Sequence, residues 1–175
     1  MKPARLALAL GAIIATSVAL SSIHPWGNPH EQSQSQILLQ GSSAPEAVRQ
    51  VLTSKCADCH SDSTHYPAYS RFAPVSWLLE RDIQQGRQHL DLSQWQHYSI
   101  ESQIDLLARI GSEVRNGQMP VRQYLLLHPQ ARLTPGEQQR IYDWTKVERK
   151  QLRKQSAEKA GGQTNPAQQG TSNVD

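Results

Sequence analysis

One pentapeptide constrains this chain more than any other feature, and it reads Cys56-Ala57-Asp58-Cys59-His60. The chain has no other cysteine in its 175 residues. Cys-x-x-Cys-His is the attachment sequence of c-type haem. Residues three and four apart share one face of a helical turn, so both sulfurs can reach the vinyl groups on one porphyrin edge while the imidazole lies under the iron. We therefore predict one haem c, held covalently by Cys56 and Cys59, with His60 as an axial iron ligand.

A redox-active dithiol is the alternative for two cysteines at this spacing. A disulfide across Cys-x-x-Cys closes a very short loop and adds little stability, so it belongs mainly to redox-active thiol sites. Such a site in a thioredoxin-like fold lies within a βαβ pattern. The apolar residues of this chain follow helical spacing and form no convincing alternating strand. We therefore favour covalent haem.

The N-terminus has the composition of an export signal. Two basic residues, Lys2 and Arg5, come before an uncharged apolar run from Leu6 to Leu20. A secretory signal has the same order, a positive n-region followed by an apolar h-region. We favour cleavage after Ser21, because a run of about fifteen residues is short of the ~20 that span a bilayer comfortably. An uncleaved anchor in the inner membrane is the alternative. In both cases we expect the chain beyond residue 22 to be exported to the periplasm.

Composition divides the remainder of the chain. Residues 23–43 are rich in Gln, Ser, His and Pro and are interpreted as a linker. Residues 156–175 are mostly polar and are predicted to form a disordered tail. A haem-binding cytochrome c-type domain is expected between them, over 44–155. The hydrophobic share is only 37% and there is a single Phe, so we expect a lean core that a buried porphyrin completes.

The domain is predicted to be all-α, with class I cytochrome c-like helices wrapped around one covalent haem. A first helix runs from about Pro45 to Lys55, and its apolar face consists of Val48, Val51 and Leu52. A second begins near Pro74 and ends about Gly86, and its apolar residues are Val75, Leu78 and Leu79. Pro near the first turn is typical of a helix start.

Two further helices follow. One begins at Ser99, ends at Asn116-Gly117, and has an apolar stripe formed by Ile100, Ile104, Leu107, Gly111 and Val114. The last begins at Thr134, and Glu137 three residues later completes a capping box. Its apolar face is expected to consist of Ile141, Trp144 and Val147. Beyond residue 147 this helix is strongly polar, so we expect it to project into solvent.

Met119 is predicted to be the second axial ligand of the iron. It is the only methionine besides Met1 and it precedes Pro120, which fixes its own φ and restricts Met119. A thioether opposite histidine is an electron-carrier arrangement and raises the reduction potential above that of two histidines. The alternatives are a gap-filling methionine or ligation by another histidine. Four histidines are candidates for such ligation, and for each of them we favour a structural or surface role instead: His65, His89, His97 and His128.

Several side chains are candidates for contact with the porphyrin or its propionates: Tyr66, Tyr69, Arg71, Trp77, Arg87 and Trp95. Arginine offers a planar two-point fork to a carboxylate. Tyrosine and tryptophan can pack against the ring while donating one hydrogen bond. Ordinary packing is the alternative for each of them.

The order of these features resembles that of single-domain class I cytochromes c. A more specific resemblance, over about residues 45–145, is to the bacterial haem-binding domain family. Four segments carry it: Tyr66–Ser70, Ala73–Trp77, Gly86–Leu90 and Tyr124–Ala131. Ala68 departs from that pattern, which usually has an aromatic residue there. The resemblance implies an exported domain with a single c-type haem.

Filled axial positions favour an electron carrier over an enzyme. With His60 and Met119 both on the iron, no coordination site is open to substrate. We therefore expect single-electron transfer in the periplasm with protein redox partners that the sequence does not identify. The alternatives are a haem-based sensor or enzyme with an exchangeable sixth ligand, and a module that docks a larger oxidoreductase through Lys146–Lys154. The formal charge of +3, two of which come from Lys2 and Arg5, gives no support for nucleic-acid binding.

Overall fold

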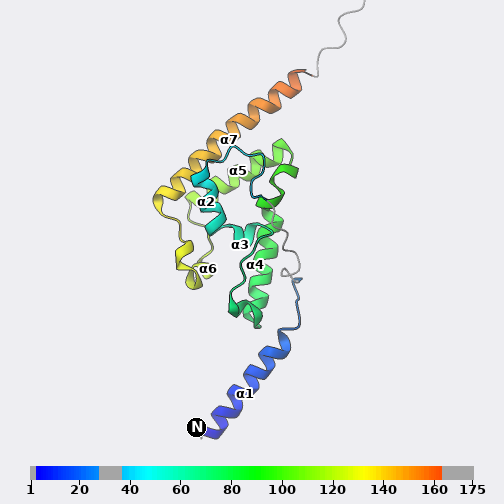
Figure 1. Cartoon of the computed structure of the whole chain (residues 1–175), viewed down its shortest axis with the longest axis vertical. Helices are drawn as coiled ribbons and strands as arrows, with labels where there is room; N and C mark the ends of the chain where they lie inside the picture. The colour runs from blue at the N-terminus through cyan, green and yellow to red at the C-terminus, as the bar shows by residue number, and fades with distance from the viewer. Residues whose placement is uncertain (1–2, 28–36, 163–175) are drawn as a thin grey trace, which may run out of the picture. The chain divides into compact units, whose positions relative to one another are not determined.

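The computed structural model describes residues 3–27 and 37–162, and all the regular structure in these ranges is helical. The all-α prediction is therefore confirmed for the described part of the chain. The chain divides into two compact units, and Figure 1 labels the α-helices that they contain. The first comprises Met1–Gln40 and Leu52–Gln94, and the second comprises Gly41–Val51 and Trp95–Asp175.

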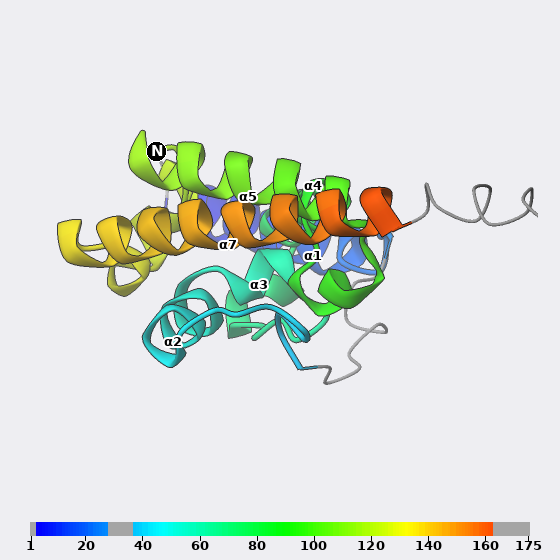
Figure 2. The same ribbon diagram turned by 90° about the horizontal axis from the view of Figure 1, so that it is seen from above.

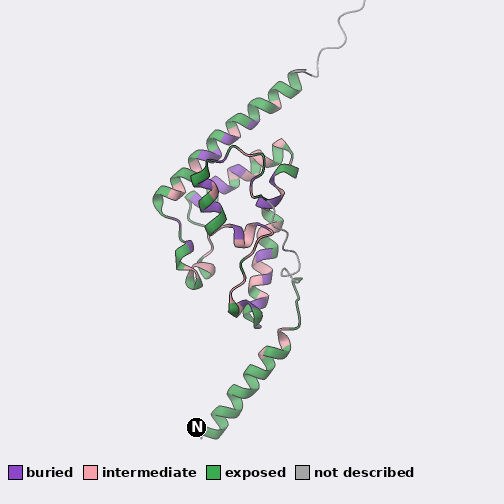
Figure 3. Ribbon diagram, in the orientation of Figure 1, coloured by how far each residue is buried: buried purple, intermediate pink, exposed green. Residues whose placement is uncertain are grey.

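The first unit contains the N-terminal helix and the elements around the Cys-x-x-Cys-His sequence. Helix α1 (Pro3–Leu20) is exposed along almost its whole length (Figure 3). Helix α3 (Ala57–His60) and the 3-10 helix η2 (Ala68–Arg71) both pack against α4 (Val75–His89). The buried apolar side chains of this unit include Leu39, Ala57, Ala73, Ile83 and Leu92.

Two elements cross the boundary between the units. Helix α2 (Glu46–Lys55) begins in the second unit and ends in the first, directly before Cys56. Its predicted apolar face is confirmed, because Val48, Val51 and Leu52 are all buried. The 3-10 helix η3 (Leu92–His97) follows α4 and leads into the second unit.

The second unit is built around two long helices that lie side by side (Figure 2), α5 (Ile100–Arg115) and α7 (Pro135–Gly162). The short helix α6 (Arg122–Leu127) and the 3-10 helix η4 (Pro129–Ala131) connect them. Buried side chains on the two long helices include Leu107, Ile110, Val114, Ile141 and Trp144. The predicted stripe of α5 thus contributes to the core of this unit.

Both predicted ends of α5 and the predicted start of α7 are confirmed. The Ser99 side chain accepts a hydrogen bond from the Ser102 backbone N–H at 3.1 Å, and so caps α5. Gly117 has a φ of +66° and follows the last turn of that helix. At the start of α7, the Glu137 carboxylate accepts from the Thr134 backbone N–H at 2.7 Å. The Glu137 backbone N–H donates to the Thr134 hydroxyl at 3.3 Å, which completes the capping box.

Helix α4 differs from expectation in its length and in its buried face. It continues one turn past Gly86, and Val75 and Leu78, expected as apolar face residues, are 39% and 42% exposed. The buried residues are instead Ser76, Glu80 and Ile83. The face that packs is set by contacts with distant segments of the first unit, and the local apolar pattern does not contain that information.

Helix α7 also differs from expectation. Val147 is exposed, whereas the neighbouring Glu148 is buried. Its carboxylate accepts hydrogen bonds from the Ser43 backbone N–H, at 3.0 Å and 3.2 Å, and from the Ser43 hydroxyl. Leu152 is buried as well, so this helix still packs beyond residue 147.

The expected linker and tail lie only partly within the described ranges. Within the 23–43 segment, Leu39 is fully buried, and its backbone N–H donates to the Leu92 carbonyl at 2.9 Å. Residues 28–36 of that segment fall outside the described residues. Helix α7 continues to Gly162, past the expected domain end at 155, and residues 163–175 of the expected tail also lie outside the described residues.

Candidate functional site

Cys56, Cys59 and His60 lie together on one helical turn of the first unit. The Cys56 backbone N–H donates to the Leu52 carbonyl at 3.0 Å, so the turn continues directly from α2. The Cys59 and His60 N–H groups both donate to the Cys56 carbonyl, at 3.3 Å and 3.1 Å. All three side chains are half-buried. The turn therefore presents two sulfurs and one imidazole from a single rigid segment.

The His60 ring is oriented by two backbone carbonyls near the C-terminal end of α4. Its Nδ1 lies 3.1 Å from the Gly86 oxygen and 3.0 Å from the Leu90 oxygen. A carbonyl oxygen only accepts, so Nδ1 must carry the proton. The neutral ring then has its lone pair on Nε2. The Nε2 lone pair of His60 is thereby available to bind a metal. Metal-bound histidines are usually fixed in this way, with the other ring N–H donating to an acceptor of the protein.

No disulfide joins Cys56 and Cys59. Burial raises the pKa of the Cys59 thiol to about 12, and the negative charges of Asp58 and Asp82 act in the same direction. A redox-active dithiol works through a thiolate of low pKa. Cys59 is therefore not a low-pKa thiolate of the kind that begins dithiol exchange.

Gly86 allows the attachment turn to pack directly on α4. A Cβ placed at this position would come within 2.5 Å of the Cys59 carbonyl oxygen and 3.3 Å of the Cys59 Cβ. Any larger residue would therefore push the Cys59 backbone away from α4. The contact also places the Gly86 carbonyl where His60 Nδ1 can donate to it.

Arg87, the next residue of α4, holds the chain that follows His60. Its Nε donates to the Ser61 carbonyl at 2.8 Å, and its Nη2 donates to the Thr64 hydroxyl at 3.0 Å. The Thr64 hydroxyl in turn donates to the Asp58 carbonyl at 2.6 Å. Arg87 was considered as a propionate partner, and in this structure its guanidinium fixes the attachment loop.

A second set of bonds ties the same loop to the segment after α4. The Asp62 backbone N–H donates to the Ser93 hydroxyl at 3.1 Å, and that hydroxyl donates to the Asp62 carboxylate at 2.7 Å. The Ser93 backbone N–H donates to the Asp91 carboxylate at 2.9 Å. The attachment turn is thus held from both sides by contacts within the first unit.

Met119 belongs to the second unit, whereas Cys56, Cys59 and His60 belong to the first. It follows α5, and the backbone N–H groups of Gln118 and Met119 both donate to the Glu113 carbonyl, at 2.9 Å and 3.4 Å. Its side chain is half-buried. The loop is therefore fixed to the last turn of α5, and iron ligation by Met119 stays a prediction.

The remaining histidines have surroundings of their own. His65 and His97 are exposed. His89 is also exposed, and its Nδ1 lies 2.7 Å from the Gln85 carbonyl, one turn back in α4. The His128 ring stacks on that of Tyr124, with 4.3 Å between ring centroids. These are the structural or surface roles that the sequence favoured for them.

The aromatic candidates and Arg71 are spread over the first unit and the start of the second. Trp95 is buried, and its ring meets that of Tyr98 edge-on at 6.3 Å between centroids. The Trp77 indole N–H donates to the Ile23 carbonyl at 2.7 Å, so a segment near α1 uses this donor. Tyr66 and Tyr69 are half-buried, and Arg71 is exposed.

Sequence reasoning missed the roles of Gly86 and Leu90, which act through backbone atoms. Gly86 was interpreted as the end of its helix. A glycine inside a helix costs about 1 kcal/mol relative to alanine and usually has a packing reason. A glycine at position 86, inside a helical pattern, was therefore a signal that the sequence contained. The Leu90 carbonyl left no signal, because any residue supplies the same oxygen.

The family model described as a haem-binding domain matches residues 15–147, which is most of the chain. Comparison with curated proteins and with solved structures gives no match.

Proposed function

We propose that this chain, which belongs to the haem-binding domain family, is an exported monohaem c-type cytochrome that transfers single electrons. Haem binding is the property shared by the family. The covalent bonds through Cys56 and Cys59, the axial ligands His60 and Met119, and the electron-carrier role are our proposal.

The orientation of His60 carries this proposal. Both carbonyl oxygens within reach of Nδ1 fix the proton on that nitrogen, so Nε2 is left to bind the iron. Hydrogen bonds of this kind also raise the basicity of a metal-bound imidazole.

The cysteines are suited to thioether formation. In that step each thiol S–H adds across one vinyl C=C bond, so the sulfur bonds to one carbon and the hydrogen goes to the other. The step consumes thiols and needs no oxidant. Cys56 and Cys59, three residues apart on one helical turn, would supply the two thiols.

A bound haem supplies a one-electron couple between Fe(III) and Fe(II), and its axial ligands set the potential. His60 and Met119 would together leave no coordination site for a substrate. An electron carrier is therefore favoured over an enzyme, with redox partners that are other proteins. The apolar α1 at the N-terminus supports export and a periplasmic site of action.

Visible spectra of the oxidised and reduced protein, with and without carbon monoxide, test this function. The proposal expects low-spin iron in both states and slow or no carbon monoxide binding near neutral pH, because the protein fills both axial positions. A high-spin protein that binds carbon monoxide readily would contradict the carrier role. It would instead favour a haem-based sensor or enzyme with an exchangeable sixth ligand.

A further inference from the structure

The C-terminal end of α1 makes specific contacts with the start of α4. The Ser17 hydroxyl donates to the Ala73 carbonyl at 2.5 Å, and the Ala73 backbone N–H donates to the Ser21 hydroxyl at 3.0 Å. The Trp77 indole N–H donates to the Ile23 carbonyl at 2.7 Å. These three hydrogen bonds join the last turn of α1 and the residues after it to the start of α4.

The buried carboxylate of Glu80 on α4 makes a further contact with the segment that follows α1. Glu80 is 3% exposed, and its Oε1 lies 2.6 Å from the Nδ1 of His24. Its Oε2 has no hydrogen-bond partner in the part of the chain that the structure describes. A buried acid depends strongly on each partner it has. The residues just after α1 are therefore part of the fold of the first unit.

The family match also includes the C-terminal part of α1. It begins at residue 15, inside α1, and so includes Ser17 and Ser21. Cleavage after Ser21, which the sequence alone favoured, would cut within the matched region. It would also remove both serines that bond to Ala73.

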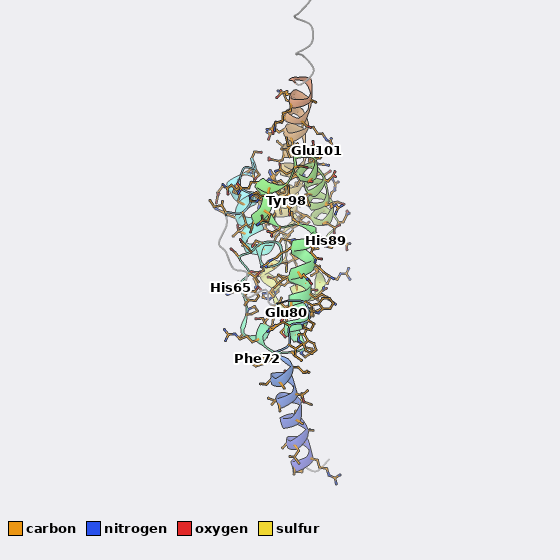
Figure 4. All side chains as sticks on the ribbon, turned by 90° about the vertical axis from the view of Figure 1, so that its right-hand side faces the viewer. His65, Phe72, Glu80, His89, Tyr98 and Glu101 are labelled. Carbon is orange, nitrogen blue, oxygen red and sulfur yellow. The ribbon has the colours of Figure 1, made fainter. Side chains whose placement is uncertain are left out.

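Large apolar side chains are exposed around this junction. Phe72 is 51% exposed and lies beside the end of α1 (Figure 4). Val75 and Leu78, on the first turns of α4, are also exposed. On the α1 side, Ile23 and Trp26 are exposed too. We call these five residues the apolar collar.

Helix α1 is long and apolar enough to cross a membrane, and none of its residues is buried. Arg5 lies in its first turn, and Lys2 precedes it in the sequence. Positive charge at that end favours an orientation with the N-terminus in the cytoplasm and the remainder of the chain outside. The apolar collar then lies where the helix leaves the bilayer.

We propose that α1 is retained as a membrane anchor, and that the apolar collar rests in the lipid headgroup layer on the periplasmic side. Aromatic side chains concentrate at this depth, because their rings are apolar and their edges tolerate water. The lipid interface would cover these exposed apolar side chains, which lie on segments that contact the end of α1. The contacts of Ala73 and Trp77 with the end of α1 hold the first unit against the membrane surface.

Retention is tested on the haem-loaded full-length chain produced in a bacterial host with its own export machinery. Intact mass and N-terminal sequencing of the mature protein should show that residues 15–22 are still present. The protein should remain with the membrane pellet after alkaline carbonate extraction. A mature N-terminus at Ser22, or anywhere later in the chain, would overturn the proposal.

Contact of the apolar collar with lipid needs a separate experiment. A photo-reactive benzoylphenylalanine placed at Phe72 should give adducts with phospholipid when the full-length protein in phospholipid vesicles is irradiated. The matched control carries the same group at Leu126, an 82% exposed residue of the second unit. Lipid adducts at position 72 and far fewer at 126 are expected. Equal or absent lipid labelling at position 72 would refute the membrane contact, whatever the state of the haem.

Discussion

A Cβ atom placed on Gly86 would lie 2.5 Å from the carbonyl oxygen of Cys59, closer than real Cβ contacts allow. The substitution Gly86→Ala should therefore separate α4 from the attachment turn and disturb the carbonyl that receives His60 Nδ1. We expect a loss of about 1 to 3 kcal/mol in the free energy of unfolding, the usual range for overpacking. Denaturant titration of the haem-loaded protein measures it, and haem-stained gels should show a lower yield of attached haem.

Gly161→Ala is the matched control for that experiment. It lies within α7, and none of the described atoms comes within 4 Å of a Cβ at this position. Alanine should leave stability unchanged or raise it by up to about 1 kcal/mol, because it is the better helix former. If Gly86→Ala proves as stable and as well loaded with haem as Gly161→Ala, the close packing is not needed.

Met119→Ala tests the predicted sixth ligand. Removal of the thioether should open one axial position, lower the reduction potential and allow rapid carbon monoxide binding to the reduced protein. Redox titration and carbon monoxide difference spectra measure these changes. Gln118→Ala serves as the control, because Gln118 is the exposed neighbour whose backbone N–H shares the Glu113 carbonyl. Identical potentials in wild type and Met119→Ala would exclude Met119 as the ligand.

The contact between α5 and α7 gives a prediction for the second unit. A Cβ on Gly111 would lie 2.6 Å from the Thr145 hydroxyl oxygen. Gly111→Ala should cost about 1 to 3 kcal/mol of stability through this clash. Adding Thr145→Ala removes the hydroxyl, so the double variant should be more stable than Gly111→Ala alone. Simple additivity of the two single changes in denaturant titrations would show that the Thr145 hydroxyl is not the source of the cost.

The sequence revealed those parts of the fold that depend on neighbouring residues. The capping box of Thr134 and Glu137 and the stripe of α5 were predictable, because the residues that make them lie within a few turns of one helix. Cys56, Cys59 and His60 formed a recognisable site for the same reason. Their spacing along the chain already determines that they share one turn.

Ile141 and Trp144 of α7 are buried as predicted, but the buried glutamates of α4 and α7 were not predictable in this way. Glu80 is buried because His24, 56 residues away, reaches its carboxylate. Glu148 is buried because Ser43, 105 residues away, donates to it. From the sequence alone a charged residue is expected to be solvent-exposed, because its distant hydrogen-bond partner is not known. The close approach of Gly86 to Cys59 likewise depends on tertiary packing that periodicity does not contain.

The stability of the fold is expected to depend on haem. Apolar residues make up a modest share of the chain, and a ligand that binds only the folded state shifts the equilibrium toward that state. Chain produced without cytochrome c maturation should therefore show little cooperative thermal unfolding by circular dichroism. The haem-loaded protein provides the comparison. A cooperative transition in the apoprotein at nearly the same temperature would mean that the polypeptide folds without its cofactor.

Covalent attachment of haem is tested most directly by intact mass spectrometry of the denatured protein, purified from cells with cytochrome c maturation. The polypeptide is expected to carry the added mass of one haem, with peptide mapping placing it on Cys56 and Cys59. The double variant Cys56→Ser with Cys59→Ser should lose that mass entirely, because no thioether can form. A wild-type polypeptide at its unmodified mass, with haem extractable into acidic organic solvent, would contradict the attachment.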